Sequence, residues 1–290
     1  MRVTVRVPAT SANLGPGFDC FGLALDLCNE VTLDTDADPG VEWHGEGAGE
    51  IPVDGSDLVS RTIASVVSAS GGESPPVRLI GRNAVPLERG LGSSAAATVA
   101  GVVLGSLLSL GDGGADLDPH ETFSRAAAFE GHPDNAAPAV FGGFTIAVPG
   151  GSVRRLDPHP DLRPVVLVPP GVRLATDEAR AALAQTVALD DAIFNASHAA
   201  LMVHALTREP PLLAEAMLDR IHQSVRLALL PQVGVVFEAL RDRGMAVCVS
   251  GSGPSLLAFE TPDLTLPELG EGWQAMRVGV RASGFEVSGR

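Results

Sequence analysis

A glycine-rich turn followed by two serines is the segment whose chemistry is easiest to predict. Residues 86–96 read PLERGLGSSAA, and the small and apolar residues after the turn predict a helix over residues 93–110. The first N–H groups of a helix lack intrahelical partners, and the helix dipole adds partial positive charge there. Glycines let the backbone approach a ligand closely. The segment is therefore predicted to bind an anion, best a phosphate, with serine hydroxyls in reach of a metal ion.

A polar turn with the sequence FEGHPDN occupies residues 129–135, between two apolar segments. Glu130 could bind Mg²⁺, which prefers one or two carboxylates together with phosphate oxygens. Asp134 and Asn135 could orient a hydroxyl nucleophile. The same residues could equally form an ordinary solvated turn that caps the next element. Both interpretations stay open on the residues alone.

Other polar groups could bind a small substrate. The loop over residues 8–19 is low in charge but contains Asn13 and Asp19. Arg180 and Arg226 lie on predicted helices, and Arg suits bidentate capture of carboxylate or phosphate, although most helix arginines are simply solvated. A second glycine-rich loop, residues 250–255, lacks the glycine spacing of a nucleophile elbow. Six histidines, among them His222, show no metal-ligand spacing and are interpreted as surface or core residues.

The composition of the 290 residues excludes several mechanisms. The chain contains no Lys, so all twenty basic residues are Arg. A Walker P-loop, a protein-kinase site and Schiff-base chemistry each need a Lys. The net charge of −15 argues against a nucleic-acid partner. No apolar run approaches the ~20 residues of a membrane span. Three cysteines without a C-x-x-C pair favour a cytoplasmic location.

The elements that must position these loops mix helices and strands without strict alternation, which favours an α+β fold. Helices are expected over residues 58–70, 93–110, 117–130, 176–188, 212–230, 233–243 and 273–282. Strands are expected over residues 3–7, 77–80, 140–148, 165–168, 245–249, 256–259 and 285–288. A segment rich in Gly, Pro and Arg, residues 149–164, is the expected junction between two domains, 1–150 and 151–290.

The three loops together resemble the three motifs of the GHMP kinases, the family of galacto-, homoserine, mevalonate and phosphomevalonate kinases. Residues 86–96 match the family's phosphate loop, P-x-x-x-G-L-G-S-S-A-A, at every fixed position, and residues 250–255 resemble its third motif. Residues 8–19 and 130–135 are most similar to the homoserine kinases within the family, as is the chain length. The resemblance implies a two-domain GHMP kinase-like fold with the active site between the domains.

The resemblance also implies an activity and the residues that carry it. The reaction would be ATP-dependent phosphorylation of the side-chain hydroxyl of L-homoserine in threonine biosynthesis, with Mg²⁺ held by Ser94 and Glu130. Contacts to ATP are expected from Leu58 and from Pro86, Leu87, Glu88, Arg89, Gly90, Leu91, Gly92, Ser93, Ser94, Ala95 and Ala96. Contacts to homoserine are expected from Asn13, Asp19, His132, Arg180 and Arg226. Asp19 would meet the ammonium group, and the two arginines would clamp the carboxylate.

Catalytic roles are expected for Asp134, Asn135 and Thr176. Asp134 is a candidate base, Asn135 could hold the hydroxyl, and Thr176 would face the γ-phosphate. Two departures from the family pattern accompany the match: Arg82 replaces the usual Lys before the phosphate loop, and residues 223–226 read QSVR where the family often has Glu-Pro-Tyr-Arg. A homodimer is compatible with the sequence.

Three alternatives remain. Another GHMP kinase, acting on mevalonate or a sugar, would not need a paired Arg and acid for a zwitterion. A dinucleotide-dependent oxidoreductase is suggested by the loose fingerprint Gly90-x-Gly92-x-x-Ala95, but Pro86 interrupts the strand that this fingerprint requires. A non-catalytic nucleotide sensor on the same fold is the third alternative.

Overall fold

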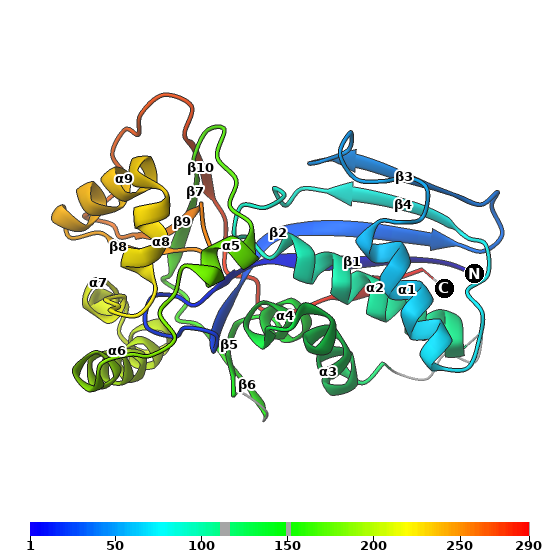
Figure 1. Ribbon diagram of the computed structural model, residues 1–290, viewed down its shortest axis with the longest axis horizontal. Coiled ribbons are helices and arrows are strands. Elements are labelled where there is room, and N and C mark those ends of the chain that lie inside the picture. The colour runs from blue at the N-terminus through cyan, green and yellow to red at the C-terminus, as the bar shows by residue number, and fades with distance from the viewer. Residues whose placement is uncertain (111–116, 149–151, 290) are drawn as a thin grey trace.

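Two β-sheets, each covered by helices, make up the molecule (Figure 1). The computed structural model describes residues 1–110, 117–148 and 152–289. Helices and strands mix without the repeated βαβ order of a doubly wound sheet, so the predicted α+β class is confirmed. The two sheets lie side by side along the long axis of the molecule, and α5 (Thr176–Ala181) lies between them.

The first sheet contains seven strands in the order β11-β1-β2-β4-β3, with β5 paired to β2 and β6 paired to β5. Its strands are β1 (Arg2–Ala12), β2 (Phe21–Asp34), β3 (Gly40–Gly45), β4 (Arg78–Asn83), β5 (Phe144–Ala147), β6 (Val153–Leu156) and β11 (Glu286–Ser288). One face packs on α1 (Leu58–Ala69), α2 (Ser93–Leu110), α3 (Pro119–Glu130) and α4 (Pro133–Phe141). Apolar side chains of β1, β2 and β4 form a single core with these helices.

The second sheet contains four antiparallel strands in the order β10-β7-β9-β8. They are β7 (Arg163–Val168), β8 (Ala246–Val249), β9 (Leu256–Glu260) and β10 (Gln274–Arg277). Alternate residues of β7 serve two cores, because successive strand side chains point to opposite faces. Val166 packs with α6 (Leu189–Thr207) and α7 (Leu213–Ala216). Val165 packs with α9 (Pro231–Asp242), which follows α8 (Gln223–Leu229). A 3₁₀ turn, η2 (Pro210–Leu212), joins α6 to α7.

Helix α2 is the central support of the site. It is 18 residues long and apolar enough to cross a membrane by length and composition, but most of it is buried in the core of the first sheet. It packs against α1 at Gly101 and Gly105, as the sequence predicts for glycines at a close helix contact. Its first residue, Ser93, follows the glycine-rich turn directly, so the rigid core fixes where that turn lies.

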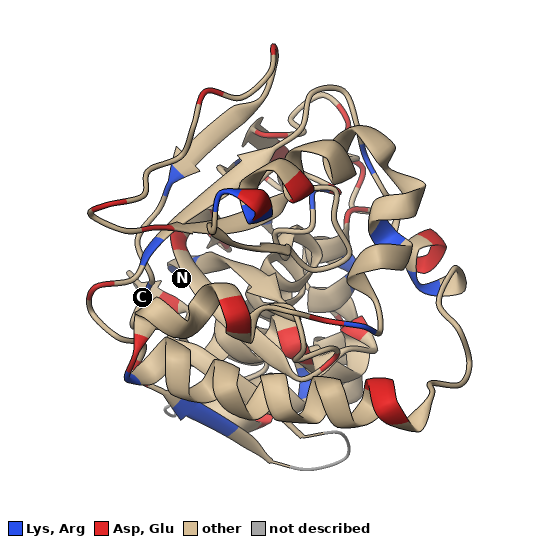
Figure 2. Cartoon of the chain, turned by 90° about the vertical axis from the view of Figure 1, so that its left-hand side faces the viewer, with Lys and Arg blue, Asp and Glu red and all other residues tan. Residues whose placement is uncertain are grey.

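Charged residues are scattered over the elements, and acidic and basic positions are interspersed in the view of Figure 2. The net charge of −15 is therefore spread over the molecule. A cationic group in a site must attract its ligand at short range against this background, because surface charges beyond about 10 Å are largely screened by salt.

Two predicted helices are wrong. The segment 273–282 forms β10 followed by extended chain, not a helix. Met276, Val278 and Val280 all pack against the core that contains Val166, and this spacing of two residues is that of a strand. The predicted helix over residues 212–230 is broken into η2, α7 and α8. The break occurs because the Asp219 carboxylate accepts the N–H groups of residues 221–223, which a continuous helix would use internally.

Two other predictions need correction. Helix α5 ends at Ala181 rather than residue 188, and its N-cap is Ala175, so Thr176 is the first helical residue. The predicted strand over residues 140–148 is the end of α4 followed by β5, separated by two glycines with positive φ. Pro133 at the start of α4 is the signal that sequence reasoning left unused.

The division at residue 150 stays a prediction, and strand pairing crosses it twice. Strands β6 and β11 lie after residue 150 in the chain, yet both belong to the first sheet. An isolated bridge between Leu25 and Val280 adds a third link. The first sheet is therefore completed by the last part of the chain.

The contact between α1 and α2 yields a stability test. A Cβ built on Gly101 would lie 2.6 Å from the Thr62 Cβ, so Gly101→Ala should lower the free energy of unfolding by about 1–3 kcal/mol. Gly234 in α9 is the matched control, since its Cβ would meet nothing closer than 3.6 Å. Gly234→Ala should raise stability by about 0.5–1 kcal/mol through helix propensity. Denaturant unfolding measures both, and equal effects would contradict the close packing.

Candidate active site

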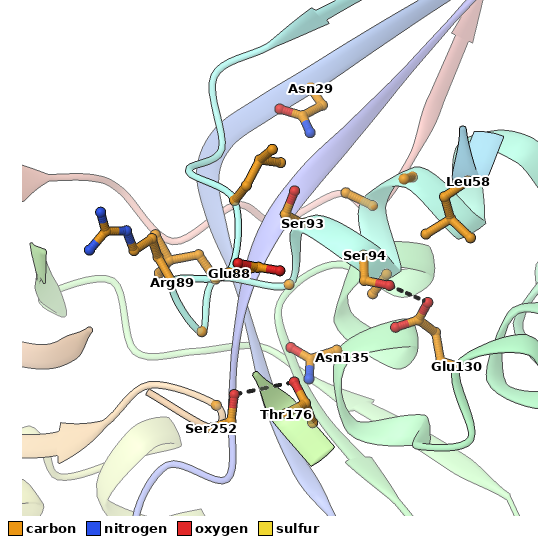
Figure 3. A pocket seen from close by; sticks show the side chains of 18 of the residues that line it. Asn29, Leu58, Glu88, Arg89, Ser93, Ser94, Glu130, Asn135, Thr176 and Ser252 are labelled. Carbon is orange, nitrogen blue, oxygen red and sulfur yellow. Dashed lines mark hydrogen bonds between the residues drawn. The ribbon is translucent and has the colours of Figure 1, made fainter. Parts of the chain in front are cut away.

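A pocket of about 640 Å³ lies where the two sheets meet. Its wall is built from the loop between β1 and β2, the start of α1, the glycine-rich turn, the α3–α4 turn, α5, α8 and the loop after β8. All the residues predicted for the site line this pocket except Pro86, which is buried beside it. Segments more than 200 residues apart in the chain thus form one cavity, and Figure 3 shows part of it from close by.

The glycine-rich turn presents its backbone to the pocket. The first hydrogen bond of α2 runs from the Ala96 N–H to the Gly92 carbonyl, so the N–H groups of residues 93–95 precede the helical ladder. Gly90 and Gly92 have φ of 71° and 67°, a region that favours glycine. A Cβ on Gly92 would lie 1.9 Å from Thr10 Oγ1, so the turn leaves no room for a side chain. Free N–H groups at a helix start suit a phosphate.

The loop over residues 250–255 holds this turn in place. The Ser250 hydroxyl donates to the Gly90 carbonyl at 2.7 Å, and a Cβ on Gly90 would lie 2.2 Å from the Ser250 carbonyl oxygen. The Ser255 N–H donates to the Arg89 carbonyl. The Arg89 side chain donates to the carbonyls of Pro169 and Val172, and Figure 3 shows it directed away from Ser93. Arg89 therefore ties the turn to the loop after β7.

Oxygen donors suited to a magnesium ion meet at the start of α2. Glu130 Oε1 accepts hydrogen bonds from Ser94 Oγ at 2.9 Å and from Thr98 Oγ1 at 2.6 Å. Figure 3 shows Ser94 and Glu130 facing each other across the pocket wall. A carboxylate and a hydroxyl beside a phosphate-binding turn match the hard-oxygen preference of Mg²⁺, so the residues present fit the ion. Thr98, which sequence reasoning missed, fixes the Glu130 carboxylate.

One acidic and two basic side chains also line the pocket. Arg180 and Asp19 form a bidentate ion pair, with Nη1 to Oδ2 at 2.9 Å and Nη2 to Oδ1 at 2.7 Å. Both groups are about one-third exposed, so the pair is open to exchange with a ligand. The sequence assigned these two residues to opposite ends of one substrate, and the structure brings them into direct contact.

Arg226 is a different kind of cation. It is 3% exposed, and its Nη1 donates to the Gly251 carbonyl at 2.6 Å. Among the described residues, no carboxylate lies within 4 Å of its guanidinium. Burial lowers the pKa of Arg226 to about 10, since removing a cation from water disfavours the charged form. A buried guanidinium without a protein anion is prepared for an anionic ligand.

Asn13 and His132 lie where the sequence placed them, but Asn13 is already engaged. Its Nδ2 donates to the Gly251 carbonyl at 2.8 Å, and its Oδ1 accepts the Asp19 N–H at 3.0 Å. Asn13 has a positive φ of 69°, which Asn tolerates better than most residues. Its side chain therefore shapes the loop that carries Asp19. His132 is half-buried on the pocket wall and forms the N-cap of α4.

The three residues predicted for catalysis surround the middle of the pocket. Asp134 is 3% exposed, and its Oδ1 has no hydrogen-bond partner among the described residues. Burial, reinforced by the nearby Asp19, raises the pKa of Asp134 to about 7. Asn135 Oδ1 accepts from Thr10 Oγ1 at 2.8 Å. Thr176 Oγ1 lies 3.4 Å from Ser252 Oγ (Figure 3).

Several lining residues were missed from the sequence. Asn29 accepts the N–H groups of Ala84 and Val85 with its Oδ1 and thereby fixes the entry to the glycine-rich turn. Trp43 lies in β3, within a segment whose Gly and Asp content hid a strand. Arg173 crosses to Glu50 in a bidentate ion pair, with oxygen–nitrogen distances of 2.5 and 2.8 Å. None of these positions carries a local motif.

Comparison with known proteins gives the class to which this fold and site belong. The model of the GHMP kinases N terminal domain matches residues 57–143, and that of the GHMP kinases C terminal matches residues 202–274. The first match includes the glycine-rich turn and Glu130, and the second includes Arg226 and the loop at 250–255. These matches define a kinase of the GHMP type.

Relatives over the full length specify the branch. The chain is 42% identical to the homoserine kinase of Clavibacter michiganensis subsp. michiganensis, over 99% of this chain and 94% of that protein. It is 45% identical to the homoserine kinase of Leifsonia xyli subsp. xyli, over 89% and 80% respectively. The crystal structure of homoserine kinase from Cytophaga hutchinsonii superimposes with a TM-score of 0.82 at 28% identity, covering 99% of this chain and 97% of that one. The chain therefore belongs to the homoserine kinases of the GHMP kinase family.

The comparisons do not support the two alternative enzyme functions, those of another GHMP kinase and of a dinucleotide-dependent oxidoreductase. A crystal structure of mevalonate kinase matches with a TM-score of 0.70 at 10% identity, which shows a shared fold alone. The strand that follows α2 in the chain, β5, pairs antiparallel with β2 and β6 and does not pair with β4, so β4 and α2 do not begin the parallel βαβ unit of a dinucleotide-binding site. The oxidoreductase alternative is therefore not supported.

Asp134 yields a pH-dependent stability test. The pKa of its carboxyl is 3.8 when exposed and about 7 in the folded chain, so the free energy of unfolding falls as the pH rises between these values. Asp134→Asn removes this loss. The free energy of unfolding of the variant minus that of the parent should therefore be about 2 kcal/mol larger at pH 8 than at pH 5. Denaturant unfolding at both pH values measures the difference, and Asp263→Asn on the surface is the control. A difference that does not change with pH would contradict the raised pKa.

Proposed function

We propose that the chain transfers the γ-phosphate of ATP to the side-chain hydroxyl of L-homoserine, giving ADP and O-phospho-L-homoserine for threonine biosynthesis. One observation supports this substrate most directly. The pocket wall carries one carboxylate, Asp19, and two guanidinium groups, Arg180 and Arg226. This set complements a zwitterionic amino acid, whereas a hydroxy acid or a sugar would leave a charge unused.

The ATP side of the proposal relies on backbone groups. The N–H groups at the start of α2 would bind the phosphates, and the region around Leu58 would lie by the adenine. Ser94 and Glu130 would hold Mg²⁺, which when bound offsets negative charge on the phosphate oxygens. The absence of Lys from the chain makes these groups and arginine the available source of positive charge.

At the substrate end, we propose an exchange of ion pairs. The homoserine ammonium would take the place of Arg180 on Asp19, and the released Arg180 would join Arg226 on the carboxylate. Before binding, Asp19 is paired with Arg180 and Arg226 has no carboxylate partner in the described part of the chain, whereas in this arrangement all three groups face an opposite charge on the substrate. A ligand without an ammonium group would leave the Asp19–Arg180 pair in place and reach Arg226 alone, and a ligand without a carboxylate would leave Arg226 without an anion. A zwitterion is therefore the ligand that uses all three groups.

For the chemical step, we propose that the hydroxyl oxygen forms a bond to the γ-phosphorus while the bond to the bridging oxygen of ADP breaks. Asp134 is the proposed acceptor of the hydroxyl proton, because a pKa of about 7 suits a base near neutral pH. Asn135 would orient the hydroxyl, and Thr176 would contact the γ-phosphate. The loose transition state leaves positioning and charge compensation as the main contributions. We also place the protein in the cytoplasm, which its three free thiols favour.

A coupled assay for ADP release tests the activity. Homoserine should give turnover that depends on both ATP and Mg²⁺, and mevalonate should give none above background, because it lacks an ammonium group for Asp19. Equal turnover of both compounds would contradict the proposed substrate. Turnover of neither would favour the nucleotide sensor.

Arg226→Ala tests the carboxylate contact. Loss of one charge-assisted hydrogen-bonded pair is worth roughly 1.5–3 kcal/mol, so the KM for homoserine should rise about ten- to a hundredfold. The KM for ATP should change little, since the proposed phosphate contacts are the backbone N–H groups at the start of α2 rather than Arg226. Arg173→Ala is the matched control, because Arg173 lines the pocket beside Glu50 and should leave the KM for homoserine unchanged. A parallel rise in the KM for ATP in Arg226→Ala would mean that this residue binds phosphate.

A further inference from the structure

His222 lies outside the predicted site, yet it contacts the residue that the proposed function assigns to the substrate carboxylate. It is fully buried. Its Nδ1 lies 3.1 Å from Arg226 Nη1, and its Nε2 lies 2.8 Å from the Gly15 carbonyl oxygen. The imidazole therefore joins the loop between β1 and β2 to α8.

These two contacts define which nitrogen carries the proton. A carbonyl oxygen only accepts hydrogen bonds, so Nε2 must donate to Gly15. An Arg guanidinium only donates, so Nδ1 must be bare and accept from Arg226. Burial lowers the pKa of His222 to about 4, which keeps the ring in this neutral form. A protonated ring would place a donor against the Arg226 donor.

The chain around His222 is built to hold the ring. The Asp219 carboxylate accepts the N–H groups of Ile221, His222 and Gln223, together with Asn195 Nδ2. This turn ends the preceding helical segment and starts α8, which places Arg226 one turn after His222 on the same helical face.

A second contact connects the ring to the loop that carries Asp19. Phe18 stacks on His222, with ring centroids 5.1 Å apart and an interplanar angle of 29°. The Arg226 guanidinium carbon lies 5.3 Å from the Phe18 ring centroid, and that of Arg180 lies 5.7 Å away. The two cations thus approach one aromatic ring, which stabilises them by a cation–π interaction.

The Arg226 guanidinium is directed by its two fixed contacts. Nη1 is shared between the Gly251 carbonyl and His222 Nδ1. Nε is buried and has no hydrogen-bond partner in the described part of the chain. The hydrogen bonds that the guanidinium makes there both go through Nη1, and Arg226 lines the pocket, so the N–H groups of Nη2 are left to donate to a carboxylate.

We propose that His222 is a positioning residue for substrate recognition, which holds Arg226 by accepting a hydrogen bond from Nη1 through Nδ1. The inference rests on the proposed function, because it concerns binding of the homoserine carboxylate. His222 makes no proposed contact with the substrate, yet through Arg226 it contributes to specificity for an amino acid.

Two substitutions separate the hydrogen bonds of the ring. The amide of a Gln extends to the position of Nε2, so His222→Gln retains a donor for Gly15 and loses the acceptor for Arg226. The amide of an Asn ends near the position of Nδ1, so His222→Asn retains the acceptor and loses the bond to Gly15. His222→Gln should raise the KM for homoserine about tenfold and leave the KM for ATP unchanged. His222→Asn should restore most of the homoserine affinity.

A double-mutant cycle with Arg226→Ala provides the decisive measurement. Once Arg226 is absent, His222→Gln should raise the KM for homoserine no further. Three results would overturn the proposal. The first is an independent tenfold rise in the KM for homoserine in that background, and the second is an equal rise in the KM for ATP. The third is an equal loss of homoserine affinity in His222→Gln and His222→Asn. If His222→Gln fails to fold, His222→Asn alone carries the test: it should keep the KM for homoserine near the parent value, and a tenfold rise would overturn the proposal.

A control variant tests for general damage to this region. Gln223 belongs to the same buried network, where it donates to the Met217 carbonyl and accepts the Val249 N–H without touching Arg226. Gln223→Met should lower stability but leave the KM for homoserine near the parent value. A rise equal to that of His222→Gln would overturn the proposal. Absence of homoserine turnover in the parent protein would instead refute the proposed function.

Discussion

The close backbone contact between the glycine-rich turn and the loop at residues 250–255 is the constraint on which the site depends. Gly90 approaches the Ser250 carbonyl so closely that no Cβ fits, and the Ser250 hydroxyl bonds to both Gly90 and Ser11. Ser250 and Gly251 follow β8 of the second sheet, whereas Ser11 belongs to the first. The contact therefore sets the distance between the phosphate-binding turn and the substrate wall. In-line transfer needs that distance to be fixed within a fraction of an ångström.

The same loop also orients the groups that are proposed to bind homoserine. The Gly251 carbonyl accepts hydrogen bonds from Asn13 and from Arg226, so one peptide group helps to orient the loop of Asp19 and the buried guanidinium. The proposed site would bind anions largely through backbone N–H groups and arginine, in a chain that has no lysine and a net charge of −15. Fixed dipoles and pre-oriented guanidinium groups need little reorganisation when charge develops, which is the main source of electrostatic catalysis.

The residues predicted for the site almost all line one pocket, whereas several of the helices and strands that carry them were predicted wrongly. Residues 86–96 could be assigned because glycines, serines and a following helix produce an anion site by local geometry alone. The helix over residues 93–110 and the start of α3 at Asp118-Pro119 were also predictable from local signals. His222 could not be assigned, because its importance comes from contacts with Gly15 and Phe18, about 200 residues away. The break at Asp219 and the edge strand β10 were missed because long-range contacts override the helical pattern there.

Strand β11 pairs with β1 at the edge of the first sheet, in the register Thr4 with Ser288. Residues 286–288 therefore cover backbone hydrogen-bonding groups of β1, a strand that precedes them by more than 270 residues. In a nascent chain that still lacks β11, β1 presents an open edge able to pair with another chain. The first sheet therefore closes only after residues 286–288 have been translated.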